Sequence, residues 1–219
     1  MTKISAVYFF LHTLSLIFLI FSAAVALPLV WRGFYYMHIN ALHLTEITPW
    51  SYDEIRAAYD EMMDFCMHGA PFGTGVLKWS EEGMLHFADC RVLFMLDLRV
   101  LLVSFTAVVL LLAFGKPRNI SMPKICGRGP FFWAGVIPAV IFIALVVLVA
   151  LTDFDQAFVT FHHMFFPGKS NWLFNPYEDE IINVLPEVFF MDCAILIVVV
   201  IVVLSIVSIL IDRSLRKKK

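Results

Sequence analysis

The sequence predicts an all-α integral membrane protein in which four transmembrane helices carry an extracellular cap. Of its 219 residues, 61% are hydrophobic, and the mean hydropathy is +0.85. A hydrocarbon layer ~30 Å thick needs about 20 apolar residues of helix. The stretches that reach or approach this length are residues 6–30, 92–114, 131–151 and 188–211. The more polar residues 31–91 and 153–187 would form the cap, so we expect a single membrane domain over residues 1–219.

The first hydrophobic stretch is interpreted as a retained transmembrane helix rather than a signal peptide. It is longer than the apolar region of a usual signal peptide, and Lys3 is the only charge before it. It also lacks a convincing small-residue cleavage site before Pro28. We therefore count it as the first of the predicted spans.

The charges that flank the predicted spans favour one orientation. The loop Lys116–Gly129 and the tail from Arg213 are basic, whereas residues 31–91 and 153–187 are rich in Asp and Glu. Because cytoplasmic loops carry the excess of Lys and Arg, we expect a multi-pass cell-membrane protein with both termini in the cytoplasm. The acidic segments would then lie outside. This topology explains the basic residues, so no nucleic-acid partner is expected.

The cap is predicted to contain short helices and one short strand. Residues Tyr52–Met63 have the period of an amphipathic helix, whose apolar side would carry Ile55, Ala58, Tyr59, Met62 and Met63. The glycine-rich segment Gly69–Gly75 would end it, and Val76–Trp79 could form a strand. Ser80 can then cap a helix that runs directly into the second span.

A first group of candidate functional residues surrounds His86, just outside the second predicted span. Glu82 lies four residues before it and Asp89 three residues after it, so all three would share one helix face. We expect Asp89 to orient the imidazole and raise its basicity, with Glu82 as a second partner. The alternative is an exposed helix face that carries three common polar residues.

A second group follows the third predicted span. A stripe at helical spacing consists of Phe154, Phe158, Phe161 and Phe165. His162 would face with these rings, whereas His163 would be rotated by ~100°. A helix with such a stripe would lie in the membrane interface. The alternative is that His162 is only a hydrogen-bonded polar group under the cap.

Charges within the predicted spans form a third group. Burying an unpaired charge in a membrane is costly, so such residues usually pair or line a polar cavity. We expect Arg99 to pair with Asp192 near the outer ends of two spans; the alternative is that Arg99 binds a phosphate or carbonyl of a substrate. His12, within the first span, is expected to be a neutral or hydrogen-bonded histidine rather than a ligand.

Two histidines near aromatic residues suit acyl transfer. The reaction needs a base for the nucleophile and a donor for the oxyanion. We assign these roles to His86 and His162 respectively; the alternative is that the two histidines exchange roles, since the sequence determines neither tautomer nor distance. The sequence has no Gly-x-Ser-x-Gly element, which favours direct transfer between substrate groups. A wall that excludes water could come from Phe72, Trp79, Phe87, Phe158, Phe165, Phe166 and Trp172.

Two motifs resemble those of the lipoprotein intramolecular transacylase (Lit) family of Gram-positive bacteria. The first is Ser80-Glu81-Glu82-x-x-x-His86-x-x-Asp89. The second is Phe161-His162-x-Met164-Phe165-Phe166, followed by Trp172-x-Phe174 and Pro186-Glu187-x-Phe189-Phe190. The resemblance implies that His86 and His162 are the catalytic pair; His163, in a variable position, is a departure that bears on the second assignment.

The resemblance also implies a substrate. It would be a lipoprotein with an N-terminal S-diacylglyceryl cysteine, whose sn-2 acyl chain moves to the α-amino group of the same cysteine and gives a lyso-form lipoprotein. The enzyme would act beside membrane lipids and would need no cofactor and no metal. Acyl-chain preference and oligomeric state stay open.

Two other classes of membrane protein compete with this interpretation. A redox protein linked to a quinone or to thiols could use Cys66 and Cys90, which share the predicted outer side, although free thiols are favoured over a disulfide between them. Haem binding would require histidines inside the bundle, where only His12 lies well within a span. A non-catalytic assembly factor would leave His86 and His162 dispensable.

Overall fold

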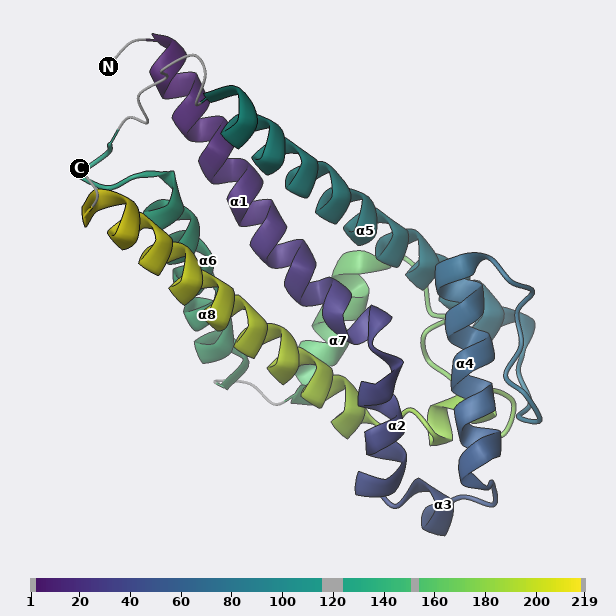
Figure 1. The fold of residues 1–219 in the computed structure, drawn as a ribbon. Helices are drawn as coiled ribbons and strands as arrows, with labels where there is room; N and C mark the ends of the chain where they lie inside the picture. Colours follow the sequence, from purple (N-terminus) through teal and green to yellow (C-terminus); the bar gives the residue numbers. More distant parts are fainter. Residues whose placement is uncertain (1–2, 116–123, 151–153, 218–219) are drawn as a thin grey trace. The chain divides into compact units, whose positions relative to one another are not determined.

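A computed structural model describes residues 3–115, 124–150 and 154–217 (Figure 1). The regular structure of these residues is helical, apart from an isolated β-bridge between Ile125 and Arg128. The elements are α1 Lys3–Val30, α2 Arg32–Ala41, α3 Leu44–Ile47, α4 Tyr52–His68, α5 Glu81–Gly115, α6 Pro130–Ala150, α7 Phe154–Phe165, η1 Glu180–Asn183 and α8 Glu187–Lys217. The all-α prediction is confirmed. The strand expected over Val76–Trp79 is wrong, since this segment turns and then runs as irregular chain.

Three of the described helices are long and apolar enough to cross a membrane, over Ser5–Val30, Glu81–Phe114 and Glu187–Lys217. The described apolar part of α6, Pro130–Val146, is shorter, and Leu151 at the end of the predicted third span lies outside the described residues. Helix α5 runs without a break from Glu81 into the second predicted span, as expected. A fourth span at α6 stays a prediction.

The chain divides into two compact units, each with its own core. The first unit is Met1–Leu27, Asp97–Ala150 and Leu196–Lys219. Within it, Leu16, Val108, Phe131 and Ala134 pack into one apolar cluster, and Ile20, Ala24 and Ile201 pack into another.

Helices α6 and α8 approach each other closely inside this first unit. A Cβ atom at Gly135 would lie 2.5 Å from the carbonyl oxygen of Ser205, so glycine is what this approach allows. His12 is fully buried against the rings of Tyr8 and Phe131. Its two nitrogens have no hydrogen-bond partner among the described residues, so of the two states expected for His12, neutral or hydrogen-bonded, the second is not found there.

The second unit is Pro28–Leu96 and Leu151–Ile195, and its core lies mainly under α4. Ser51 and Glu54 form a capping box at the start of this helix. Gly69, with φ of +75°, ends the helix in the left-handed conformation. All the residues expected on its apolar side are buried: Ile55, Ala58, Tyr59, Met62 and Met63.

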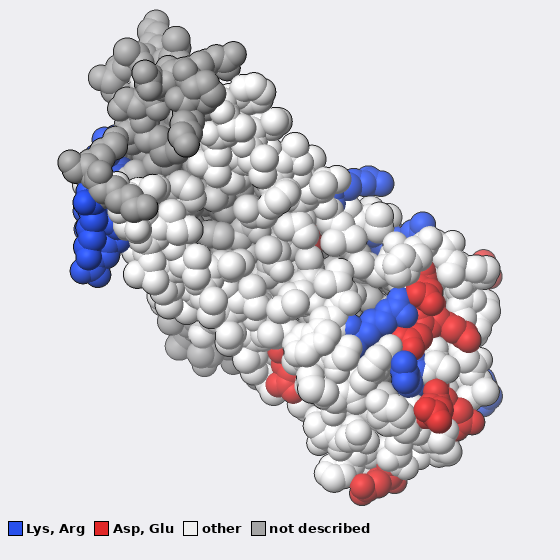
Figure 2. Space-filling view, viewed as in Figure 1, with Lys and Arg blue, Asp and Glu red and all other residues white. Residues whose placement is uncertain are grey.

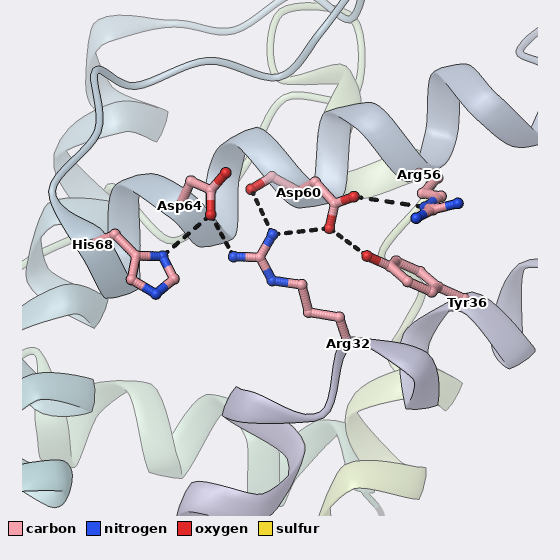
Figure 3. A network of polar contacts seen from close by, with 6 residues as sticks. All are labelled: Arg32, Tyr36, Arg56, Asp60, Asp64 and His68. Atoms are coloured by element: carbon pink, nitrogen blue, oxygen red, sulfur yellow. Dashed lines mark hydrogen bonds and ion pairs between the residues drawn. The ribbon is translucent and has the colours of Figure 1, made fainter.

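Charged side chains gather on the surface of this unit, over α2 and α4 (Figures 2 and 3). Arg32, at the start of α2, contacts Asp60 at 3.0 Å and Asp64 at 2.5 Å. Tyr36 also donates to Asp60, and His68 contacts Asp64. The Arg32 guanidinium thus ties α2 to α4, and it holds the pKa of Asp64 below its usual value.

Candidate active site

His86 and His162 lie together in the second unit, with ring centroids 5.8 Å apart. His86 comes from the first turns of α5 and His162 from the last turns of α7. Each is only 6% exposed. The sequence prediction that these two residues share one site is therefore consistent with the geometry, whereas neighbouring His163 is exposed.

Aromatic rings surround both imidazoles. Phe166 and Phe174 lie 5.0 and 5.4 Å from the ring of His86. Phe158 lies 4.2 Å from the ring of His162, and Trp172 stacks on that ring at 4.6 Å. Of these, Phe174 was not expected in the wall, although its place two residues after Trp172 in the second motif could have indicated it.

Two other expected members of the wall lie elsewhere. Phe165 is 44% exposed and packs on Phe161. Trp79 is 45% exposed; it contacts Phe72 and lines a surface hollow with Tyr177. Helix α7 therefore turns His162 inward, while Phe161 and Phe165 lie on its exposed side. The predicted single stripe of phenylalanines is wrong in this respect.

The hydrogen bond of His162 fixes which of its nitrogens can accept a proton. Nδ1 lies 2.8 Å from the carbonyl oxygen of Phe158. A carbonyl only accepts, so Nδ1 carries the hydrogen, and the lone pair of the neutral ring is on Nε2. Burial lowers the pKa of His162 below its ordinary value of 6.5, partly opposed by this bond, and the charge of His163 lowers it further. In its neutral form, His162 therefore offers an acceptor at Nε2.

His86 has a different polar environment from the one expected. Its Nε2 lies 3.4 Å from Sγ of Cys90, one turn later in α5. Its Nδ1 is buried and has no hydrogen-bond partner among the described residues. The Asp89 carboxylate binds Lys169 at 2.5 Å and Asn171 at 3.2 Å, so its hydrogen bonds go to these two residues and not to the imidazole that it was expected to orient.

Lys169 and Asn171 could not be found from the sequence pattern, because they lie in irregular chain between α7 and η1. Their bonds to Asp89 connect this segment to α5, and Trp172 lies in the same segment. Asp89 therefore supports the site by holding the chain that carries Trp172. Glu82 is exposed at the start of α5.

Ser80 and Asp179 anchor the start of α5 within the same unit. Ser80 accepts a hydrogen bond from the backbone N–H of Gly83, as a capping residue does. Its own N–H and hydroxyl donate to the buried Asp179 carboxylate at 2.8 and 2.9 Å. A Cβ atom at Gly83 would lie 2.1 Å from Asp179 Oδ1, so glycine permits this approach. The expected cap at Ser80 is confirmed.

The remaining predictions concern Arg99, Asp192 and the cysteines. Asp192 contacts Nε2 of His38 at 3.0 Å, in place of the expected pair with Arg99. Arg99 belongs to the first unit and is exposed. Cys66 and Cys90 are both free, and Cys66 Sγ donates to the carbonyl of Phe87. Among the described residues, no three His, Cys, Asp or Glu side chains gather as metal ligands would.

Comparison with known proteins agrees with this fold. The family model described as "Lipoprotein intramolecular transacylase Lit" matches residues 10–190. The structure of the membrane-integral lipoprotein intramolecular transacylase Lit from Bacillus cereus superposes with a TM-score of 0.89, at 24% identity, covering 100% of this chain and 98% of that chain.

Two variants of the same Bacillus cereus protein also match. One has a histidine replaced by arginine and the other a histidine replaced by alanine; each gives a TM-score of 0.81 at 24% identity. They cover 98% of this chain and 93% and 94% of their own. A comparison with curated protein sequences gives no significant match.

Proposed function

The chain belongs to the lipoprotein intramolecular transacylase family, whose model matches residues 10–190, and from this premise we propose the reaction that its histidine pair performs. The substrate is a lipoprotein whose N-terminal cysteine carries an S-diacylglyceryl group. The sn-2 acyl chain moves to the α-amino group of that cysteine and leaves a free hydroxyl on the glyceryl group. The redox and assembly-factor alternatives gain no support from this family.

The observation that carries the proposal is the hydrogen bond of His162 Nδ1 to Phe158, because it leaves Nε2 as a proton acceptor beside His86. In the proposed step, the neutral α-amine attacks the sn-2 ester carbonyl and forms a C–N bond. His162 Nε2 takes a proton from the attacking nitrogen. The ester C–O bond then breaks, and the departing alkoxide takes that proton from His162.

His86 takes the complementary role in this proposal. The carbonyl oxygen becomes negatively charged in the tetrahedral intermediate, and a donor placed beside it stabilises that charge. The two roles are therefore exchanged relative to the sequence-based assignment, since His162 has committed its Nδ1–H to Phe158. A deprotonated amine is required, and the unperturbed pKa of an α-amino group is about 8.

The aromatic surroundings favour transfer over hydrolysis. Phe158, Phe166, Trp172 and Phe174 pack around the two imidazoles and leave each mostly buried. Water is thereby kept from the reacting carbonyl. Both groups that react belong to one molecule, so the main contribution of the protein is to hold them in the orientation for attack.

The test measures the N-terminus of a diacyl lipopeptide by mass spectrometry after incubation with purified protein. His162→Ala should lower kcat by about 10²–10⁴-fold, and His86→Ala by about 10²–10³-fold. His163→Ala is the matched control, because this neighbour is exposed and meets Trp172 edge-on, and it should retain near-normal turnover. An active His162→Ala variant beside an inactive His163→Ala variant would refute the proposal.

The orientation of the site is part of the proposal. The basic loop and tail support cytoplasmic termini, with the histidine pair on the extracellular side. Part of that loop, residues 116–123, lies outside the described residues. The lipoprotein substrate and the site would then meet at the outer face of the membrane.

A further inference from the structure

Cys90 holds a position next to His86 that the proposed reaction has not used. It lies one helical turn after His86 on α5, and its Sγ is 3.4 Å from Nε2 of the imidazole. A thiol has an unperturbed pKa of about 8.5, so it is mostly protonated at neutral pH. Its S–H can therefore donate a hydrogen bond to a ring nitrogen that carries a lone pair.

The other nitrogen of His86, Nδ1, is buried, and the described residues offer it no hydrogen bond. In a neutral imidazole one nitrogen is a donor and the other an acceptor. If the Cys90 thiol donates to Nε2, then Nε2 is the acceptor and Nδ1 must carry the hydrogen. If Nε2 carried the hydrogen, Nδ1 would be a second acceptor beside the acceptor Nε2 of His162, and the site would lack a donor for the oxyanion.

We propose that the Cys90 thiol donates to Nε2 of His86 and thereby fixes the tautomer in which Nδ1 carries the hydrogen. Cys90 is a positioning residue: it forms no covalent bond with the substrate and acts only through His86. With the tautomer fixed, the two neutral histidines differ in function. His162 presents an acceptor at Nε2, and His86 presents a donor at Nδ1–H. The catalytic role of this tautomer rests on the proposed acyl transfer, but the tautomer itself can be tested without that reaction.

The structure contains a matched thiol that lacks this relationship. Cys66 is buried in the same unit, and its Sγ donates to the backbone carbonyl of Phe87 rather than to a histidine. The same chemical change at Cys66 and at Cys90 therefore separates the loss of a buried thiol from the loss of a donor to His86. Serine replaces the thiol donor with a hydroxyl donor, whereas alanine leaves no donor.

The kinetic test compares Cys90→Ala, Cys90→Ser and the matched control Cys66→Ala on a diacyl lipopeptide. Cys90→Ala should lower kcat by about 5- to 10-fold, as expected for one lost hydrogen bond, with KM changed by less than about 2-fold. Cys90→Ser and Cys66→Ala should both stay within about 2-fold of the unchanged protein. A Cys90→Ala variant with unchanged kcat, or a Cys90→Ser variant as slow as the alanine variant, would overturn the assignment.

A spectroscopic test reads the tautomer directly. With ¹⁵N-labelled histidine, the resonances of His86 are identified by their loss in the His86→Ala variant. Nδ1 should be the protonated nitrogen in the unchanged protein, and protonation should move toward Nε2 in Cys90→Ala. A protonated Nε2 in the unchanged protein would refute the inference. These spectra require no lipoprotein, so the tautomer result can stand even if His86→Ala proves fully active and the proposed reaction fails.

Discussion

The indole of Trp172 stacks on the imidazole of His162, with ring centroids 4.6 Å apart and an interplanar angle of 29°. The same indole donates from Nε1 to the carbonyl oxygen of Lys169, three residues earlier. His162 is thus held on one side by a flat apolar surface and at Nδ1 by the backbone of α7. A base needs such a fixed direction to reach its proton.

The first prediction concerns this stack. Trp172→Ala should lower kcat by about 10- to 100-fold, because the imidazole becomes free to turn away from the orientation in which Nε2 can take the proton. Trp172→Phe keeps a flat ring but loses the bond to Lys169, so its loss should be smaller. Turnover of a diacyl lipopeptide measures both. Equal, full activity in the two variants would show that stacking does not orient His162.

The second prediction concerns pH. Burial lowers the pKa of His162 below 6.5, so its neutral, acceptor form persists as pH falls and is lost only as pH drops through that lowered value. The substrate ammonium titrates separately, near pH 8. We expect the logarithm of the rate to fall with unit slope below pH 8 and with doubled slope below the pKa of His162.

A variant should move the pH at which the slope doubles, which is the pKa of His162, in a direction that the structure predicts. The positive charge of His163 helps to lower the pKa of His162, so His163→Ala should shift the break to higher pH. His68→Ala is the control, because His68 pairs with Asp64 on the surface of the unit. Rate profiles over the acid range check both variants. A break that moves to lower pH in His163→Ala would contradict the assignment to His162.

The third prediction concerns Asp89 and Lys169. If their bond holds the segment that carries Trp172, then Asp89→Ala and Lys169→Ala should each lower kcat by a modest factor of about 3- to 10-fold, with Asp89→Ala the slower because it also loses the bond to Asn171. The double variant should be no slower than Asp89→Ala, since that change alone already breaks the contact with Lys169. A double-mutant cycle on turnover measures this. Multiplied losses would mean that the two residues act separately.

The fourth prediction concerns the ties between α2 and α4. Arg32 is about three-quarters buried and bonds to Asp60 and Asp64, so Arg32→Ala should destabilise the protein by about 1–2 kcal/mol. Arg56→Ala, on the same network but half exposed and 3.7 Å from Asp60, should change stability little. Thermal unfolding of purified protein in detergent compares them. Equal Tm values for both variants would count against the role of Arg32.

The fifth prediction concerns sidedness. In a protein without its native cysteines, Ser51→Cys at the exposed start of α4 should react with a membrane-impermeant reagent added outside. Ser121→Cys, in the basic loop outside the described residues, should react only after the membrane is opened. Labelling of both positions from outside would contradict the proposed topology, in which the termini are cytoplasmic and the histidine pair is extracellular.

Local periodicity explains which parts of the structure could be predicted from the sequence. The buried side of α4 follows from residues spaced within one helix, and the inward turn of His162 follows from its offset to Phe158. The pairing of His86 with His162 was predicted from the family motifs instead. These two residues are distant in sequence, so no local pattern could predict that they lie together.

The failed expectations have a common physical cause. Asp89 was expected to orient His86 of its own helix, but Lys169 and Asn171 reach it from irregular chain that has no period. Asp192 was expected to pair with Arg99 at a similar depth, but it contacts His38 of α2, and the period of a single helix does not determine which residue of another helix it meets. The direction of the Cys90 side chain toward Nε2 of His86 depends on rotamers, which spacing along a helix does not determine.

The contact between Ser80 and Asp179, which are 99 positions apart, also bears on how the protein matures. During synthesis α5 emerges long before Asp179, so the helix must wait for its anchor and for the chain that carries His162 and Trp172. Closing so long a loop costs entropy that only late contacts repay. A nascent chain should therefore stay inactive until the segment that carries Asp179 has docked, and truncation before η1 should yield an inactive protein.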